Sequence, residues 1–282
     1  MIAIVYSGSR YAHWQLAEKG GISSEFKTPG INPFLNDEKF IQNILHKNSE
    51  LINYAEKIKQ IYFFGAGASS KERKDIVATA FTKFFRFGKI VVENDLYAAA
   101  LASCNDQPGI VGVLGSGSNA AYFDGKKVKA NNFGLGYILA DEGSSNDMGK
   151  MLLKSFLNET LPEELEQKFR KKYDLDRKQI LDKIYRQKQP ALFLSSFVDF
   201  LIENRLDPFV KKLVCNGFNN YFQTYILPLK KQYPLVPIHI VGTVAANFEN
   251  WLHEVASSNH LSISTVIKEP IYNVLTYYFN KI

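Results

Sequence analysis

Small and polar residues fill one turn in the middle of the chain. The sequence Gly-Ser-Gly-Ser-Asn at 115–119 follows the apolar run 110–114, which has the length and β-branched content of a buried strand. Glycines let a backbone approach a ligand closely, successive N–H groups can cradle an anion, and the serine and asparagine side chains add hydrogen-bonding groups. A β-meander with an ordinary glycine turn is the structural alternative, although a hairpin needs only one or two such residues. The turn therefore favours a site for an anionic or polar ligand.

Two adjacent acids stand at the end of the same stretch. Asp141 and Glu142 precede a Gly-Ser pair and a predicted helix, and we interpret the apolar residues before them as a buried strand. Asp124-Gly125 predicts a hairpin turn that leads from the strand 120–123 into a further strand. Alone, Asp141 would be an ordinary surface acid, but beside Glu142 and after a strand it is a candidate site residue.

A third acid, Asp95, follows the predicted buried strand 89–92 and opens the helix 96–104. A carboxylate at a strand end can take the proton of a hydroxyl group as that hydroxyl attacks phosphorus. The same side chain can instead cap the helix by accepting a backbone N–H. The residues alone leave both roles open.

The elements that would position these groups alternate between strands and helices. We predict strands at 2–5, 12–16, 22–26, 61–64 and 89–92, and helices over 40–55, 76–85 and 96–104. Such alternation indicates a mostly parallel sheet, and ligands bind beyond the carboxyl ends of its strands. The loops at such ends that are small or polar are 6–9, 65–70, 93–95, 115–119 and 242–245.

The second half of the chain is predicted to be mainly helical. The expected helices are 148–157, 162–173, 177–186, 193–204 and 208–233. Core packing explains their apolar faces, so we assign them no chemistry. Strands at 238–241 and 262–267 and a helix at 270–279 complete the chain.

Composition limits the classes of protein that this chain can represent. With 282 residues and a 46% hydrophobic share, it can form two domains with sizeable cores. The formal net charge of +6 comes from basic residues scattered over helical faces, so a nucleic-acid groove is not expected. The two cysteines, Cys104 and Cys215, form no CxxC motif, which leaves a zinc or iron–sulfur site without support.

The same reasoning gives an expected location. Free thiols are typical of a reducing compartment, and the N-terminal residues are too quickly polar for a signal peptide. No apolar run approaches the roughly 18 residues that a membrane span needs. We therefore expect a cytoplasmic protein without a membrane partner.

Seven motifs in a fixed order carry a resemblance to a known family. They are SGSRYAHW at 7–14, TPGINPF at 28–34, IYFFGAGASS at 61–70, ENDLYAAALASC at 93–104, PGIVGVLGSGSNAAYFDG at 108–125, LGYILADEGS at 135–144 and HIVGTVAANF at 239–248. Together they resemble the N-acetylglucosamine kinase-like branch of the BadF/BadG/BcrA/BcrD-type ATPases, in the superfamily of sugar kinases, actin and heat-shock ATPases. The resemblance implies an α/β fold with two ribonuclease-H-like domains and an interdomain cleft. The expected domains are 1–107, joined by the C-terminal helix 268–282, and 108–267, which contains a helical insertion at 146–233.

The resemblance also implies an activity, namely ATP- and Mg²⁺-dependent phosphorylation of an N-acetylated amino sugar such as N-acetylglucosamine. Asp95 falls on the catalytic base. The sugar-contacting positions fall on Asn32, Gly67, Ser69, Ser118, Asn119 and Asp141. The phosphate and adenosine positions fall on Ser7, Gly8, Ser9, Arg10, Gly115, Ser116, Gly117, Gly242, Thr243 and Ala245.

The first phosphate loop departs from the family pattern. Tyr6 stands where an Asp would hold hydrated Mg²⁺, and Arg10 stands where a hydroxyl would meet the phosphates. In one interpretation, Asp141 or Glu142 serves as the metal anchor and Arg10 contacts phosphate directly. In the other, the protein binds sugar or nucleotide without turnover.

Two further hypotheses concern cysteines and assembly. The iron–sulfur activator ATPases of the same superfamily need cysteines that bridge a dimer, and Cys104 and Cys215 do not match that pattern. The long helices predicted at 193–233 could pair two subunits, so a homodimer is a hypothesis.

Overall fold

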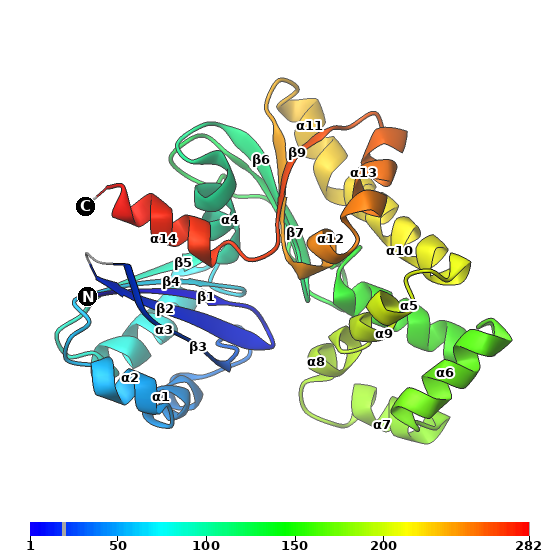
Figure 1. Cartoon of the computed structure of the whole chain (residues 1–282), viewed down its shortest axis with the longest axis horizontal. Helices are drawn as coiled ribbons and strands as arrows, with labels where there is room; N and C mark the ends of the chain where they lie inside the picture. The colour runs from blue at the N-terminus through cyan, green and yellow to red at the C-terminus, as the bar shows by residue number, and fades with distance from the viewer. Residues whose placement is uncertain (19–20, 282) are drawn as a thin grey trace. The chain divides into compact units, whose positions relative to one another are not determined.

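The computed structural model describes residues 1–18 and 21–281, and the chain divides into two compact units (Figure 1). Unit 1 comprises Met1–Gln107, Gly125–Val128 and Glu269–Ile282, and unit 2 comprises Pro108–Asp124 and Lys129–Lys268. Each unit is a mixed α/β structure with its own sheet and its own hydrophobic core. None of the helices in the described ranges combines the length and the apolar character that crossing a membrane requires.

Unit 1 contains a five-stranded sheet in the order β3-β2-β1-β4-β5. Its strands are β1 (Ile2–Ser7), β2 (Tyr11–Glu18), β3 (Gly21–Pro29), β4 (Gln60–Gly65) and β5 (Lys89–Asn94). The first three strands form the predicted antiparallel meander, and β4 and β5 run parallel to β1. The pairing places Ser7, Gly65 and Asn94 in one row across the three parallel strands, so the loops that follow them leave the same edge of the sheet.

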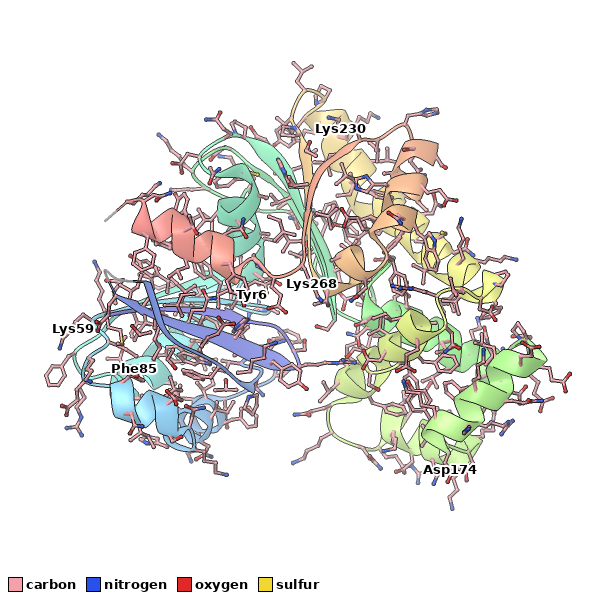
Figure 2. The ribbon with its side chains drawn as sticks, in the orientation of Figure 1. Tyr6, Lys59, Phe85, Asp174, Lys230 and Lys268 are labelled. Atoms are coloured by element: carbon pink, nitrogen blue, oxygen red, sulfur yellow. The ribbon has the colours of Figure 1, made fainter. Side chains whose placement is uncertain are left out.

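Helices cover both faces of this sheet (Figure 1). They are α1 (Glu38–His46), α2 (Ser49–Tyr54), α3 (Lys71–Phe84), α4 (Asp95–Cys104) and α14 (Ile271–Phe279). Side chains of β1 alternate between the two faces, so Ala3 and Val5 join the core formed with α1 and α3. Phe85, which follows α3, is buried in the same core (Figure 2).

Trp14 is the largest buried side chain of unit 1. Its ring stacks against Phe26 and Phe81, with centroid distances of 6.0 Å and 5.6 Å. Its indole N–H donates a hydrogen bond to Thr28 Oγ1 at 3.0 Å. This bond ties the centre of the core to β3 at Thr28, the first residue of the stretch 28–34 that the sequence analysis selected.

Unit 2 contains a four-stranded sheet in the order β7-β6-β8-β9. Its strands are β6 (Gly109–Leu114), β7 (Ser118–Phe123), β8 (Ile238–Val241) and β9 (Ile263–Ile267). Strand β7 is antiparallel to β6, and β8 and β9 run parallel to β6, so Val113, Val241 and Ile267 lie in one row. The turns that follow Leu114 and Val241 therefore leave the same edge of this sheet.

The helices of unit 2 surround one large core. They are α5 (Ser145–Leu157), α6 (Glu163–Tyr173), α7 (Arg177–Tyr185), α8 (Pro190–Ser195), α9 (Val198–Glu203), α10 (Pro208–Tyr221), the π-helical turn η1 (Phe222–Ile226), α11 (Leu227–Gln232), α12 (Thr243–Asn247) and α13 (Glu249–Ser258). The predicted helix 208–233 is therefore continuous but contains a π turn. The predicted helices 40–55 and 193–204 are each split in two, and in the first case Asn48 caps the second part by accepting the Leu51 N–H at 2.9 Å.

The prediction of strands after the Asp124-Gly125 turn and before Asp141 was wrong. Residues 124–140 form no strand apart from a single bridge residue, Val128. Leu135, Ile138 and Leu139 are 62%, 74% and 73% exposed rather than buried. The flanking Gly134 and Gly136 have positive φ angles, and the Ala140 N–H closes a turn onto the Gly136 carbonyl at 2.8 Å. The backbone therefore turns where the apolar residues of the sequence predicted an extended strand.

The Trp14–Thr28 hydrogen bond gives a test of the unit 1 core. We expect Thr28→Val, which keeps the shape of the side chain, to lower the free energy of unfolding by about 1–3 kcal/mol, because the buried indole N–H loses its acceptor. The matched control is Thr82→Val on the exposed side of α3, which should change stability by no more than about 0.5 kcal/mol. Urea unfolding measures both variants, and equal effects would contradict the role assigned to this bond.

Candidate functional site

The loop after β1 is tied to the loop after β3 through Ser7. The buried Ser7 hydroxyl accepts the Ile31 N–H at 2.8 Å and lies 2.9 Å from the Ile31 carbonyl, to which it donates. The Ser7 carbonyl accepts the Ala66 N–H at 3.1 Å, which adds the loop after β4. Ser7 therefore joins three loops at the carboxyl edge of the unit 1 sheet, and its hydroxyl is already used within the protein.

The turn at Gly8, Ser9 and Arg10 packs directly against Gly30. The Gly8 N–H donates to the Tyr11 carbonyl at 3.0 Å and the Gly30 N–H to the Arg10 carbonyl at 3.1 Å. A Cβ on Gly30 would lie 2.4 Å from the Gly8 carbonyl oxygen and 2.6 Å from that of Ser9. The sequence analysis did not select Gly30, although its place between two prolines was visible as a loop signal.

Three of the residues expected to contact sugar meet beside this turn. Asn32 Oδ1 accepts the Phe34 N–H at 3.0 Å, and a Cβ on Gly67 would lie only 2.0 Å from that same oxygen. Gly67 has φ of +82°, which also favours glycine. The Ser69 hydroxyl accepts a hydrogen bond from the Arg73 guanidinium at 2.8 Å. The structure thus packs Asn32 against Gly67, in the loop that also holds Ser69 and lies more than thirty residues further along the chain.

Asp95 is the first residue of α4 rather than its cap. Asn94 caps the helix by accepting the Tyr97 N–H at 2.9 Å, so the N-cap interpretation of Asp95 was wrong by one position. Asp95 Oδ1 accepts the Leu96 N–H at 2.9 Å. Burial raises the pKa of the Asp95 carboxyl above its usual range. A raised pKa makes a carboxylate a better proton acceptor near neutral pH.

Tyr6 lies one residue before this edge, on the face of the sheet that α14 covers (Figure 2). Burial, followed by the negative charges of Asp95 and Glu269, raises the pKa of the Tyr6 phenol, so it stays neutral at physiological pH. Glu269 contacts His13 Nδ1 at 3.1 Å, and His13 Nε2 lies 2.7 Å from Glu25. A neutral group beside Asp95 therefore stands where the resemblance expects an additional acid.

In unit 2, the turn after β6 is bound to the first residues of α5. The Gly115 carbonyl accepts the Ser145 N–H at 2.9 Å, and the Ser116 carbonyl accepts the Asn146 N–H at 3.2 Å. A Cβ on Gly117 would lie 3.0 Å from Asp141 Oδ2, so this glycine permits the close approach of the acid. The turn and Asp141 form one compact group.

Ser118, Asp141 and Glu142 are joined by hydrogen bonds. The Ser118 N–H donates to Asp141 Oδ1 at 3.2 Å, and the Ser118 hydroxyl donates to the Glu142 carbonyl at 2.8 Å. Asp141 is buried and adopts φ of +67°, a conformation that non-glycine residues rarely take. The structure thus gathers Ser118 and Asp141, which the sequence analysis selected for sugar contact. Asn119 follows directly on β7.

Burial dominates the electrostatics of Asp141. It raises the pKa of this carboxyl from its usual value of 3.8 to about 6, against the lowering effects of the Ser118 N–H and of Lys150. The negative charge of Glu142 adds to the increase. Asp141 therefore changes its charge close to neutral pH.

The turn after β8 packs on the turn after β6. Gly242 has φ of +136°, and a Cβ there would lie 2.1 Å from the Leu114 carbonyl oxygen. Thr243 begins α12 and is exposed, whereas Ala245 is completely buried in the core of unit 2. Gly242 and Gly115 are thus adjacent, and of the residues expected to contact adenosine Gly242 and Ala245 are buried, whereas Thr243 is exposed.

Two tyrosines, to which the sequence analysis assigned no chemistry, form hydrogen bonds with the segments around Asn119 and Asp141. Tyr221 Oη donates to the Asn119 carbonyl at 3.2 Å, and a Cβ on Gly112 would lie 2.0 Å from that hydroxyl oxygen. Tyr225 Oη accepts the Asp141 N–H at 3.2 Å and donates to Glu142 Oε2 at 2.5 Å. The only sequence signal was their four-residue spacing, which puts both on one side of a helix.

Protein side chains alone form no metal cluster in the described ranges. Within residues 1–18 and 21–281, no three His, Cys, Asp or Glu side chains are placed to hold a metal ion. Asp141 and Glu142 are adjacent, but their oxygens already accept hydrogen bonds from Ser118 and Tyr225. Any ion at this pair would need further ligands from a bound molecule.

Comparison with known proteins identifies the fold. No family model matches the chain. A solved structure from Porphyromonas gingivalis, provisionally named an N-acetylglucosamine kinase, is 34% identical, covers 99% of both chains and superposes with a TM-score of 0.93. A ROK-family glucokinase from Streptomyces griseus, solved with glucose and AMPPNP, is 14% identical over 97% of both chains with a TM-score of 0.54. The predicted α/β sugar-kinase fold is therefore confirmed.

A curated relative adds a name for a related activity. The N-acetylmuramic acid/N-acetylglucosamine kinase of Clostridium acetobutylicum is 31% identical over 139 residues. That match covers 46% of this chain and 45% of the relative, so the chain spans about half the length of the curated relative that it matches.

The contact between the two turns of unit 2 gives a stability prediction. We expect Gly242→Ala to lower the free energy of unfolding by about 2–4 kcal/mol, because the new Cβ meets the Leu114 carbonyl and the positive φ is strained. The matched control is Gly115→Ala, since a Cβ there meets nothing within 4 Å and should change stability by at most about 0.5 kcal/mol. A tolerated Gly242→Ala would contradict the close packing of these turns.

The raised pKa of Asp141 predicts a pH-dependent cost to stability. Because its pKa is higher in the folded protein, folding is favoured most when the carboxyl is protonated, and this advantage is lost as pH rises through about 6. Asp141→Asn, which keeps the oxygen acceptor for Ser118, should therefore raise the free energy of unfolding at pH 8 by up to about 3 kcal/mol. It should have little effect at pH 4. Denaturant unfolding at the two pH values measures this difference, and an equal effect at both would refute the assignment.

Proposed function

We propose an activity for this chain from one premise: it belongs to the same protein family as the Porphyromonas gingivalis protein, with which it aligns over almost its full length. The activity is transfer of a phosphoryl group from ATP to a hydroxyl of an N-acetylated amino sugar, with N-acetylglucosamine as the first candidate. Both the Porphyromonas gingivalis and the Clostridium acetobutylicum proteins carry N-acetylglucosamine kinase in their names. Assignment to the BadF/BadG/BcrA/BcrD-type branch and a cytoplasmic location stay predictions.

The observation that carries the proposal is the arrangement at the carboxyl edge of the unit 1 sheet. Asn32 packs against Gly67 in the loop that also holds Ser69, and Asp95 follows Asn94, which lies in one row with Ser7 and Gly65. Amide, hydroxyl and backbone groups are the hydrogen-bonding partners that a sugar needs. A carboxylate with a raised pKa at the same edge of the sheet has the character of a general base.

Asp95 would accept the hydroxyl proton of the sugar as its oxygen attacks the γ-phosphorus. The bond from this sugar oxygen to phosphorus forms, the bond from phosphorus to the β,γ-bridging oxygen breaks, and ADP leaves with the electron pair. Such a transfer depends on positioning and on neutralising charge more than on covalent chemistry. Capping of α4 falls to Asn94, so the Asp95 carboxylate need not serve that structural role.

The turns of unit 2 suit the phosphate groups of ATP. Gly115 can let its backbone approach a ligand, since a Cβ there meets nothing within 4 Å, and Ser116 adds a hydroxyl group. Gly117 and Gly242 allow the close packing that shapes this turn. We assign Arg10 of unit 1 to direct contact with phosphate, because a guanidinium can bind two phosphate oxygens at once. Ser118, Asn119 and Asp141 are assigned to the sugar.

Magnesium fits this chain as an ion that arrives with ATP. It commonly takes one or two carboxylates and completes its shell with phosphate oxygens and water. Asp141 or Glu142 would hold it through a second carboxylate oxygen, since one oxygen of each already accepts a hydrogen bond from Ser118 or Tyr225. When bound, the ion would neutralise phosphate charge.

The role of Asp95 gives the test of this function. Asp95→Asn keeps the size of the side chain and its acceptor for the Leu96 N–H but removes the base. We expect the rate of N-acetylglucosamine phosphorylation to fall by at least about 100-fold, while calorimetry shows sugar affinity within about three-fold of the natural protein. The matched control is Asp75→Asn on the exposed side of α3, which should keep the natural rate.

Two results would contradict the proposal. Full kinase activity of Asp95→Asn would show that Asp95 is not the general base. An inactive natural protein that still binds sugar, and that gains activity through Tyr6→Asp, would replace a kinase by a non-catalytic sugar-binding protein.

A further inference from the structure

One tyrosine outside the predicted site occupies the centre of the unit 2 hydrogen-bond network. Tyr225 lies in the π turn η1, and its side chain is almost completely buried. Its ring packs edge-on against Phe133, with centroids 5.0 Å apart, and lies 5.3 Å from the ring of Tyr221. A π turn inside an α-helix is uncommon and often occurs at functional positions.

The hydroxyl of Tyr225 makes different bonds to the two adjacent acids. It accepts the backbone N–H of Asp141 at 3.2 Å and donates to the carboxylate of Glu142 at 2.5 Å. A phenol has one proton to donate, so the donor is committed to Glu142. Burial, together with the bond to Glu142, raises the pKa of Tyr225, which keeps that proton in place at neutral pH.

The two hydrogen bonds of Tyr225 hold the carboxylates of Asp141 and Glu142 in different directions. Glu142 is held at η1 by Tyr225, whereas Asp141 is turned to the Ser118 N–H and to the backbone of Gly117. Asp141 reaches that position only in a left-handed backbone conformation, which is unfavourable for a residue with a Cβ. The bond from its N–H to Tyr225 supports this conformation.

Tyr221 acts on the neighbouring segment in the same way. It lies one helical turn before Tyr225, and its hydroxyl donates to the Asn119 carbonyl at 3.2 Å. One side of the helix formed by α10, η1 and α11 therefore bonds to both stretches of unit 2 that we assign to the sugar.

We propose that Tyr225 is a positioning residue of the sugar site, which anchors Glu142 away from the sugar and presents Asp141 to it. This inference rests on the proposed sugar site and extends it, because it separates the roles of two acids that the sequence makes equivalent. Asp141 contacts the sugar, and Glu142 serves as the fixed partner of Tyr225.

The side chains that face Asp141 include the acid of Glu142, the phenol of Tyr225 and the amide of Asn146. Loss of the Tyr225 hydroxyl releases the Glu142 carboxylate and removes the acceptor of the Asp141 N–H. Asp141 then loses the support for the conformation that directs its carboxylate to Ser118.

The test compares Tyr225→Phe with Tyr233→Phe. Tyr225→Phe keeps the ring packing and removes only the hydroxyl, and Tyr233 is a matched control because its ring stacks on Tyr122, at 3.7 Å, away from the acids. Calorimetric titration with N-acetylglucosamine at pH 7.5 should show about ten-fold weaker binding by Tyr225→Phe. The ATP affinity of Tyr225→Phe, and both affinities of Tyr233→Phe, should stay within about two-fold of the natural protein.

A second comparison separates positioning from simple loss of structure. In an Asp141→Asn background, Tyr225→Phe should weaken sugar binding by less than about two-fold further, since the group that it positions has already been altered. Unchanged sugar binding in Tyr225→Phe would overturn the proposal. Equal losses of sugar affinity, ATP affinity and thermal midpoint would overturn it too, by showing a structural role. A natural protein that binds no amino sugar would instead overturn the proposed function on which it rests.

Discussion

Close approach of polar groups to bare backbone holds each part of the candidate site together. A Cβ on Gly67 would lie 2.0 Å from the amide oxygen of Asn32, and a Cβ on Gly242 would lie 2.1 Å from the Leu114 carbonyl oxygen. At Gly117 the corresponding distance to the Asp141 carboxylate is 3.0 Å. Loops that are distant in the sequence can meet only because these positions lack side chains. The small residues therefore act first on the geometry of the site, and the ligand-binding role that we propose depends on that geometry.

The charged groups at both sheets are governed by burial and by a neighbouring tyrosine. In unit 1, the neutral phenol of Tyr6 stands beside Asp95, whose pKa is raised by burial. In unit 2, the phenol of Tyr225 bonds to the Asp141–Glu142 pair, and burial raises the pKa of Asp141 to about 6. Each candidate acid thus lies next to a protonated phenol, and in unit 2 that phenol donates its proton to the adjacent acid, Glu142.

Strand ends could be predicted from the sequence because an apolar run that stops at small polar residues is typical of a buried strand. The loops after β1, β4, β5, β6 and β8 were located in this way. The same pattern misled at 135–140, where apolar residues are exposed because two glycines with positive φ turn the backbone. Asp95 was considered as the helix cap, one position too late, because Asp and Asn side chains can both cap a helix and Asn94 does so here. Tyr225 was beyond prediction, because its reach depends on a π turn and on packing against a residue 84 positions earlier.

The most direct test of the proposed kinase activity is the fate of the sugar itself. Mass spectrometry of N-acetylglucosamine after incubation with the natural protein, ATP and Mg²⁺ should detect a phosphate monoester of the sugar together with an equal amount of ADP. Omission of either the sugar or the protein should leave ATP intact. Recovery of unmodified sugar and ATP from protein shown to bind both would contradict the central claim that these loops form a sugar kinase site.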